Sequence, residues 1–166
     1  NLVANVAQCR DLMGVTAEDS VIAILPFFHI YGMTVLLNIA LKARAELVTL
    51  PKFDLEQFLS TIQEQRCTYV FIAPPVAVAL AKHPLVDQYD LSSVKVVFSG
   101  AAPLDAHTAA SVAERLDCRV VQGYGMTEMG PVSHLNAPVA EDLAPLGSVG
   151  MAIPNVECKL IDPETG

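Results

Sequence analysis

Short runs of aliphatic and β-branched residues alternate along this chain with longer segments that repeat apolar residues at helical spacing. The short runs are bounded by Pro, Gly or polar residues and predict five buried strands, at residues 21–25, 46–50, 68–72, 94–99 and 119–122. The longer segments predict five helices, at residues 1–13, 32–43, 54–65, 75–82 and 105–116. Strands separated by helices of this length pair in parallel, with both faces of the sheet covered. We therefore predict an α/β fold built on a doubly wound, mostly parallel sheet with helices on both faces.

The pattern changes after about residue 135. Residues 136–146 are rich in Pro and acidic side chains, and residues 147–150 resemble a turn. Residues 156–161 alternate as a strand does, and the Asp-Pro-Glu-Thr-Gly sequence at 162–166 is typical of a hairpin. We expect the chain to end within that turn, as an internal fragment of a longer protein.

These patterns divide the chain into three expected parts. They are the helical end of a preceding subdomain at 1–19, an α/β subdomain at 20–138, and a linker with the first strands of a β-barrel-like subdomain at 139–166.

No Asp, Glu, Lys or Arg occurs between Asp19 and Lys42, which is long enough for a membrane span. Pro26, Gly32 and Asn38 interrupt this stretch, and its pattern divides into a strand, a turn and a helix. We therefore reject a transmembrane helix here.

Composition and charge limit the partners. Ten Lys and Arg stand against 18 Asp and Glu, for a formal charge of −8, whereas nucleic-acid and anionic membrane surfaces need clustered cations. A nucleotide ligand stays open, because backbone N–H groups and one or two local cations can hold a phosphate.

The four cysteines have no C-x-x-C pair, and the chain begins with Asn1 without a secretory pattern. We expect a cytoplasmic protein whose four thiols are reduced and mostly buried.

Three segments that follow predicted strands carry candidate chemistry, since ligands bind beyond the carboxyl ends of such strands. Residues 26–32 (Pro-Phe-Phe-His-Ile-Tyr-Gly) present His29 and Tyr31, although a lone His in an aromatic turn is more often structural. Residues 99–104 (Ser-Gly-Ala-Ala-Pro-Leu) are small enough for a planar ring to lie against the backbone, and Asp105 can cap the next helix. An ordinary strand-to-helix turn explains this second segment equally well.

The third segment is Gln-Gly-Tyr-Gly-Met-Thr-Glu at 122–128. Tyr124 can stack on a base, Thr127 can bond a phosphate oxygen, and Glu128 can bind Mg²⁺, which prefers oxygen ligands.

In this order and spacing, the three segments resemble those of the adenylate-forming superfamily of acyl-CoA synthetases, firefly-type luciferases and peptide-synthetase adenylation domains. Residues 51–54, 73–75, 89–94 and 162–166 resemble the 4-coumarate:CoA ligase branch. The resemblance covers nearly the whole chain. It implies an enzyme that uses ATP to convert a phenylpropenoic acid to its adenylate and then transfers the acyl group to CoA.

The resemblance also implies roles for individual residues. His29 matches the histidine that contacts the carboxylate, and with Thr127 and Glu128 it forms the expected catalytic set. Glu128 matches the Mg²⁺ ligand, and Lys52 matches a lysine near the CoA phosphates, although an exposed surface lysine is an equally good explanation. The positions expected around ATP or AMP are Ala101, Gln122, Gly123, Tyr124 and Thr127. The positions expected to line the acid pocket are Ile30, Tyr31, Val35, Gly100, Gly123, Gly125, Pro131 and Val132.

Two positions depart from the plant ligases. Val35 stands where they commonly have a small polar residue, and Phe98 where they have Lys or Met. Both changes make the site more apolar, so cinnamate-like and other aryl acids become rivals to 4-coumarate as the substrate.

The resemblance places other active-site parts outside this chain. They are the phosphate-binding loop with its lysine, the ribose-binding aspartate, the hinge and the mobile C-terminal domain with its lysine. We therefore expect no turnover from the 166-residue chain alone. The alternatives are another aryl or fatty acyl-CoA ligase, a luciferase-like enzyme, or, for the chain alone, a non-catalytic nucleotide-binding module. A purely structural domain is the weakest, because it gives no reason for three such segments to coincide.

Overall fold

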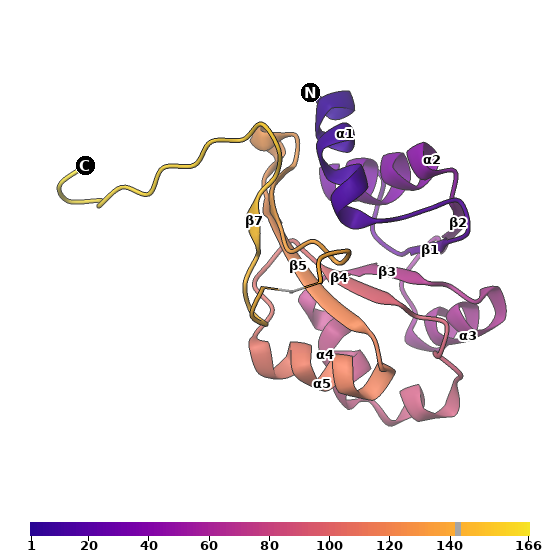
Figure 1. Cartoon of the computed structure of the whole chain (residues 1–166). Helices are drawn as coiled ribbons and strands as arrows, with labels where there is room; N and C mark the ends of the chain where they lie inside the picture. Colours follow the sequence, from indigo (N-terminus) through magenta and orange to yellow (C-terminus); the bar gives the residue numbers. More distant parts are fainter. Residues whose placement is uncertain (142–143) are drawn as a thin grey trace.

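The computed structural model describes residues 1–141 and 144–166, and a seven-stranded sheet forms its centre (Figure 1). The strands are β1 (Ser20–Ala23), β2 (Glu46–Thr49), β3 (Tyr69–Ile72), β4 (Val96–Ser99), β5 (Arg119–Gly125), β6 (Val132–Leu135) and β7 (Met151–Ala152). The α-helices are α1 (Leu2–Met13), α2 (Ile39–Ala43), α3 (Leu55–Gln65), α4 (Pro74–Lys82) and α5 (Ala106–Leu116). The other helical segments are the π-helix η1 (Tyr31–Asn38) and the 3₁₀ segments η2 (Pro84–Gln88) and η3 (Thr127–Met129).

The strand order is β2-β1-β3-β4-β5-β6-β7, with parallel pairing from β2 to β5 and antiparallel pairing of β6 and β7. The connection from β1 leads outward to β2, whereas later connections lead the other way, so the order reverses between β1 and β3. The predicted doubly wound, mostly parallel sheet is confirmed, and its ligands are expected beyond the carboxyl ends of the parallel strands.

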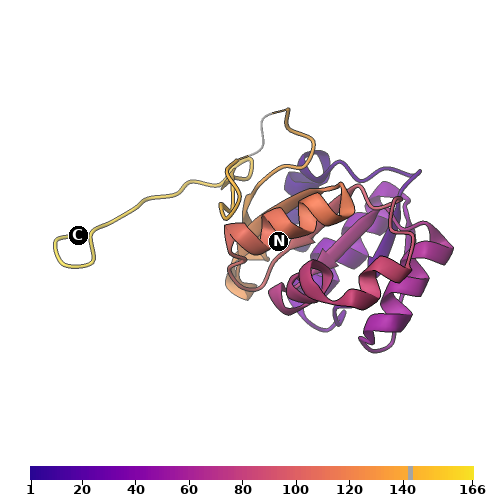
Figure 2. The same cartoon turned by 90° about the horizontal axis from the view of Figure 1, so that it is seen from below.

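Side-chain alternation along the strands gives the sheet two buried faces. Phe71 and Phe98 point to the face covered by α1, η1 and α2, and Val70 and Val97 point to the face covered by α3, α4 and α5. The two views show α4 and α5 together on one side and α1 with α2 on the other (Figures 1 and 2). The prediction of helices on both faces is therefore confirmed.

The predicted helix starts depend on caps that the structure contains. The Asp54 carboxylate accepts a hydrogen bond from the Gln57 N–H at 2.9 Å, and Asp105 accepts one from Thr108 at 2.8 Å. The uncharged stretch after Asp19 forms β1, a loop, η1 and α2, as predicted. Within the described residues, no helix has both the length and the apolar character needed to cross a bilayer.

The second half differs from the prediction in its strands. The strand expected to end at Gln122 continues to Gly125, because β6 pairs with its last residues. Residues 156–161 form no strand and are mostly exposed. Figures 1 and 2 show the last residues leading away from the body, where no neighbouring strand can supply hydrogen bonds to this segment.

The turn predicted at 162–166 is present, since the Gly166 N–H donates to the Asp162 carbonyl at 2.9 Å. The two-residue β7 pairs with β6, and neither strand is among those predicted from the sequence. Part of the expected linker, residues 142–143, lies outside the described residues. The expected β-barrel-like subdomain and the three-part division remain predictions.

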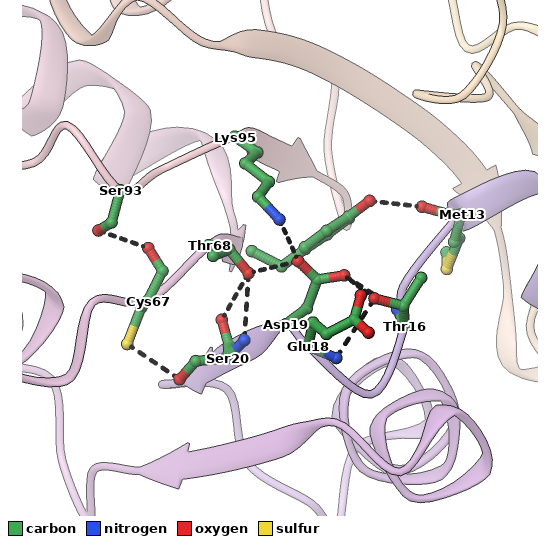
Figure 3. A network of polar contacts seen from close by, with 10 residues as sticks. Met13, Thr16, Glu18, Asp19, Ser20, Cys67, Thr68, Ser93 and Lys95 are labelled. Carbon is green, nitrogen blue, oxygen red and sulfur yellow. Dashed lines mark hydrogen bonds and ion pairs between the residues drawn. The ribbon is translucent and has the colours of Figure 1, made fainter.

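A polar network joins the amino ends of three strands (Figure 3). Buried Asp19 precedes β1 and accepts hydrogen bonds from Lys95 Nζ at 2.8 Å and Thr68 Oγ1 at 2.9 Å, while its other oxygen accepts two from Thr16. Burial raises the pKa of the Asp19 carboxyl, but the hydrogen bonds from Lys95, Thr16 and Thr68 lower it by more. The pKa of Asp19 therefore lies below the ordinary value of 3.8. The network lies at the end of the sheet opposite the carboxyl ends of the strands.

Candidate active site

A cavity of about 300 Å³ opens at the carboxyl ends of β1, β4 and β5. Its lining comes from the loop after β1, the start of η1, the end of β4, and the segment from β5 into β6. The residues are His29, Ile30, Tyr31, Val35, Phe98, Gly100, Ala101, Gly123, Tyr124, Gly125, Met126, Thr127, Glu128, Pro131 and Val132. All three candidate segments therefore meet at one site. Of the predicted site residues, Gln122 and Lys52 are absent from this lining.

The loop after β1 fixes the imidazole of His29 at the exposed mouth of the cavity. Its Nδ1 accepts a hydrogen bond from the Tyr31 backbone N–H at 3.2 Å. A neutral imidazole with an accepting Nδ1 carries its proton on Nε2, so Nε2–H is a hydrogen-bond donor. Gly32 allows this loop to turn into η1, because a Cβ there would collide with the Pro26 carbonyl. His29 is thus held in the tautomer that can donate to a ligand oxygen.

Tyr31 forms a buried part of the cavity floor. Its hydroxyl lies 3.3 Å from the Phe98 carbonyl oxygen and 3.4 Å from that of Ile72, both of which can accept its proton. Burial raises the pKa of this phenol far above its usual value, so Tyr31 stays neutral. A Cβ on Gly100 would lie 3.0 Å from two atoms of the Tyr31 ring. The glycine therefore lets the loop after β4 pass close to the ring.

The loop after β4 adopts an uncommon backbone conformation at the cavity. Ala101 has a left-handed φ of 73° and lines the cavity. A non-glycine residue in this region is strained by about 1 kcal/mol or more, and such residues cluster at ligand sites. Buried Gln122 stabilises this loop conformation. Its amide donates to the Leu104 carbonyl at 3.0 Å and accepts from the Leu104 N–H at 2.9 Å. Gln122 therefore fixes the loop from behind the cavity, and its predicted contact with AMP remains a prediction.

The end of β5 forms the opposite wall. A Cβ on Gly123 would approach Phe98 Cζ to 2.8 Å, and one on Gly125 would collide with the Pro131 carbonyl, so neither position has room for a side chain. Tyr124 lies between them and is 45% exposed. Thr127 and Glu128 begin η3 and are exposed at the rim, whereas Pro131 and Val132 are buried.

Lys52 is exposed in the loop after β2, the strand beside β1. Its position agrees with an exposed surface lysine, and its predicted CoA contact remains a prediction.

The cavity has an apolar floor and a polar rim. Tyr31, Val35, Phe98 and Val132 are buried in the floor, and His29, Thr127 and Glu128 are exposed at the mouth. Among residues 1–141 and 144–166, no group of three or more His, Cys, Asp or Glu side chains forms a metal site. A single carboxylate suffices for Mg²⁺ when substrate phosphates and water provide the remaining ligands, so Glu128 fits a Mg²⁺–nucleotide site.

Met126 is a lining residue that the predicted site did not include, and Phe98, predicted only as a position that makes the site more apolar, also lines the cavity. Phe98 shares its strand face with Val96, and its ring centroid lies 6.4 Å from that of Tyr31. Strand alternation predicts that Phe98 and Val96 lie on the same face of the sheet. Whether Phe98 packs in the core or lines a cavity depends on how η1 covers that face.

The cysteines differ partly from expectation. All four are free, and Cys9 and Cys67 are buried, but Cys118 is only half-buried and Cys158 is exposed.

A family model described as "AMP-binding enzyme" matches residues 1–166. "Probable 4-coumarate–CoA ligase 1" of Dictyostelium discoideum is 42% identical over 170 residues, covering 100% of this chain and 30% of that protein. "4-coumarate–CoA ligase 1" of Solanum tuberosum is 40% identical over 172 residues, covering 99% and 32%. The chain thus spans about a third of the length of these relatives.

Solved structures with the same fold include ATP-bound MatB from Rhodopseudomonas palustris. It is 32% identical, has a TM-score of 0.88 and covers 99% of this chain, which spans 32% of it. A long-chain-fatty-acid-CoA ligase from Archaeoglobus fulgidus is 24% identical with a TM-score of 0.87 and supports the fold alone.

Proposed function

Because the chain belongs to the AMP-binding enzyme family, we propose that it is the acid- and adenylate-binding part of an acid–CoA ligase. The full-length enzyme activates a phenylpropenoic acid with ATP and passes the acyl group to CoA. The observation that carries this proposal is the cavity, which joins an apolar floor to a rim that carries His29, Thr127 and Glu128. The names of the relatives from Dictyostelium discoideum and Solanum tuberosum support the substrate class.

In this proposal the aryl end of the acid lies on the apolar floor. Tyr31 and Phe98 supply aromatic surface, and Val35 and Val132 complete an apolar lining without a free donor. The Tyr31 hydroxyl lies within hydrogen-bonding distance of two backbone carbonyls. It therefore needs no polar substituent on the aryl ring of the acid as a hydrogen-bond partner. This chemistry favours cinnamate and its lightly substituted relatives.

The carboxylate of the acid then lies at the mouth, near His29. The Nε2–H of His29 donates to one carboxylate oxygen and stabilises the negative charge of the transition state, while the other oxygen attacks the α-phosphorus of ATP. A P–O bond forms to give the acyl-adenylate, and the bond to pyrophosphate breaks. In the second half-reaction the CoA thiol attacks the carbonyl carbon, and AMP leaves.

The nucleotide occupies the wall formed by the loop after β4 and the end of β5. Gly100 and Ala101 expose backbone to a planar ring, and Tyr124 supplies an aromatic surface for stacking. Thr127 bonds a phosphate oxygen, and Glu128 would hold Mg²⁺, which neutralises phosphate charge when bound. Lys52 pairs with the CoA phosphates. Four free cysteines support a cytoplasmic location.

The experiment is ATP–pyrophosphate exchange by the full-length protein, measured with cinnamate, 4-coumarate and decanoate. We expect exchange with the aryl acids to exceed that with decanoate by about tenfold or more, because a compact aromatic floor discriminates by shape. Faster exchange with decanoate would support a fatty acyl-CoA ligase instead. No exchange with any acid, together with binding of AMP, would support a nucleotide-binding module.

A further inference from the structure

Cys158 differs in environment from the other three cysteines. Burial raises the pKa of the Cys9 thiol to about 12 and, together with Asp117, raises that of Cys118 to about 12. Burial also raises the pKa of the Cys67 thiol. These three thiols therefore stay protonated and unreactive near neutral pH. Cys158 is exposed, in the segment that follows β7, and its Sγ lies 3.3 Å from His134 Nε2.

The hydrogen bonds behind His134 determine which of its ring nitrogens carries the proton. The Ser133 hydroxyl donates to the Tyr124 carbonyl at 3.2 Å, and this uses its only proton. Ser133 Oγ lies 3.0 Å from His134 Nδ1, so in this contact the oxygen accepts and Nδ1–H donates. The neutral ring then has an unprotonated Nε2, which faces the Cys158 thiol. Cys158 thus supplies a thiol, His134 supplies a base beside it, and Ser133 orients that base.

The ring of His134 is also held by packing. It lies edge-on to Tyr124, with centroids 6.0 Å apart and an angle of 62° between the planes. His134 is half-buried on β6, where its backbone pairs with Tyr124 of β5 and Ala152 of β7. Because His134 lies on a strand that is paired on both sides, its imidazole keeps its orientation when the thiol reacts.

Beside this pair is a second cavity of about 400 Å³. Ala4, Asn5 and Gln8 of α1 form one side, and Ser133, His134 and Cys158 form the other. It has room for the remainder of a small molecule attached to the sulfur, and Gln8 and Glu157 are polar residues in its lining. His29, Thr127 and Glu128 do not line it, and Val132 is the residue that it shares with the candidate active site.

We propose that Cys158, with His134 as its base, is a modification site that exchanges with low-molecular-weight disulfides. His134 Nε2 takes the thiol proton, and the sulfur of Cys158 attacks one sulfur of the disulfide. A new S–S bond to Cys158 forms, the original S–S bond breaks, and the released thiolate takes the proton from His134. The disulfide is the oxidant, and the products are a mixed disulfide and one free thiol. This site does not depend on the proposed acid or nucleotide.

The test treats the full-length protein with glutathione disulfide near pH 7 and locates the added group by peptide mass spectrometry. We expect the group on Cys158 and not on Cys118, which is the internal control for a half-buried thiol without a base. His134→Gln keeps a polar side chain but removes the base. It is expected to slow modification of Cys158 about tenfold, since a thiol without help is only a few per cent thiolate at neutral pH.

A second measurement separates loss of the base from loss of the fold. In concentrated urea, Cys158 is expected to react at the same rate in the wild type and in His134→Gln, because the pair no longer exists there. Equal rates in both proteins under native conditions would overturn the proposal. Preferential modification of Cys118 would overturn it as well.

Discussion

His29 shows how much of the proposed chemistry depends on one hydrogen bond. The Tyr31 N–H occupies Nδ1, which leaves Nε2–H as a donor at the cavity mouth. The sequence predicts that His29 follows a strand, but it cannot predict this tautomer, because the tautomer depends on the turn geometry between Pro26 and Tyr31. The sequence likewise cannot predict that the Gln122 amide pairs with Leu104, and the contact of Gln122 with the nucleotide remains a prediction.

His29→Ala in the full-length protein is expected to slow acid-dependent pyrophosphate release by about 10²–10³, the usual effect of removing one positioned donor. ATP affinity should change little, because the donor acts on the acid. Steady-state rates and nucleotide titrations measure the two effects. His107→Ala is the matched control, since His107 is exposed on α5 and does not line the cavity. An unchanged rate in His29→Ala would remove His29 from the reaction.

At the scale of elements, apolar runs and caps predicted five parallel strands and their helices. Asp54 and Asp105 cap their helices as predicted, because N-cap chemistry is local. Strand pairing depends on residues far apart in the sequence. For this reason the end of β5 and the strand expected at residues 156–161 were predicted wrongly. Gly123 and Gly125 have weak strand propensity but lie in β5 because β6 pairs with them. Residues 156–161 have the alternation of a strand but no described partner.

The Asp19 network is a testable element-scale feature. Asp19→Asn removes the charge that Lys95 and Thr68 bond, and we expect it to lower the local stability of β1 and β3 by about 2 kcal/mol at neutral pH. Hydrogen exchange of the β1 and β3 amides in the full-length protein measures this. Asp11→Asn is the control, because Asp11 forms only an exposed pair with Arg10 and should change stability by less than about 0.5 kcal/mol.

The effect of Asp19 should also depend on pH. Its folded pKa lies below the ordinary value of 3.8, so its stabilisation is fully present above about pH 4. As pH falls through the lowered pKa, the carboxylate is protonated and the stabilisation is lost. The wild type and Asp19→Asn should therefore converge in acid. A difference that does not shrink as the pH falls below 3.8 would contradict this assignment.

At the scale of the whole molecule, the chain spans about a third of the length of the relatives that it matches. The chain brings three segments, far apart in sequence, to the same end of a sheet and forms one cavity from them. Parallel pairing makes that convergence predictable from sequence. The shape of the cavity was not predictable, because it depends on close contacts such as those of Gly100 with Tyr31 and Gly123 with Phe98.

Identifying the nucleotide products shows whether the full-length protein adenylates an aryl acid. The full-length protein is incubated with ATP, Mg²⁺ and cinnamate without CoA, and the products are measured by mass spectrometry. The isolated 166-residue chain is the control and is expected to give no pyrophosphate. We expect pyrophosphate and cinnamoyl-adenylate from the full-length protein, both dependent on the acid. Formation of ADP and phosphate, or AMP release that does not depend on the acid, would contradict this expectation.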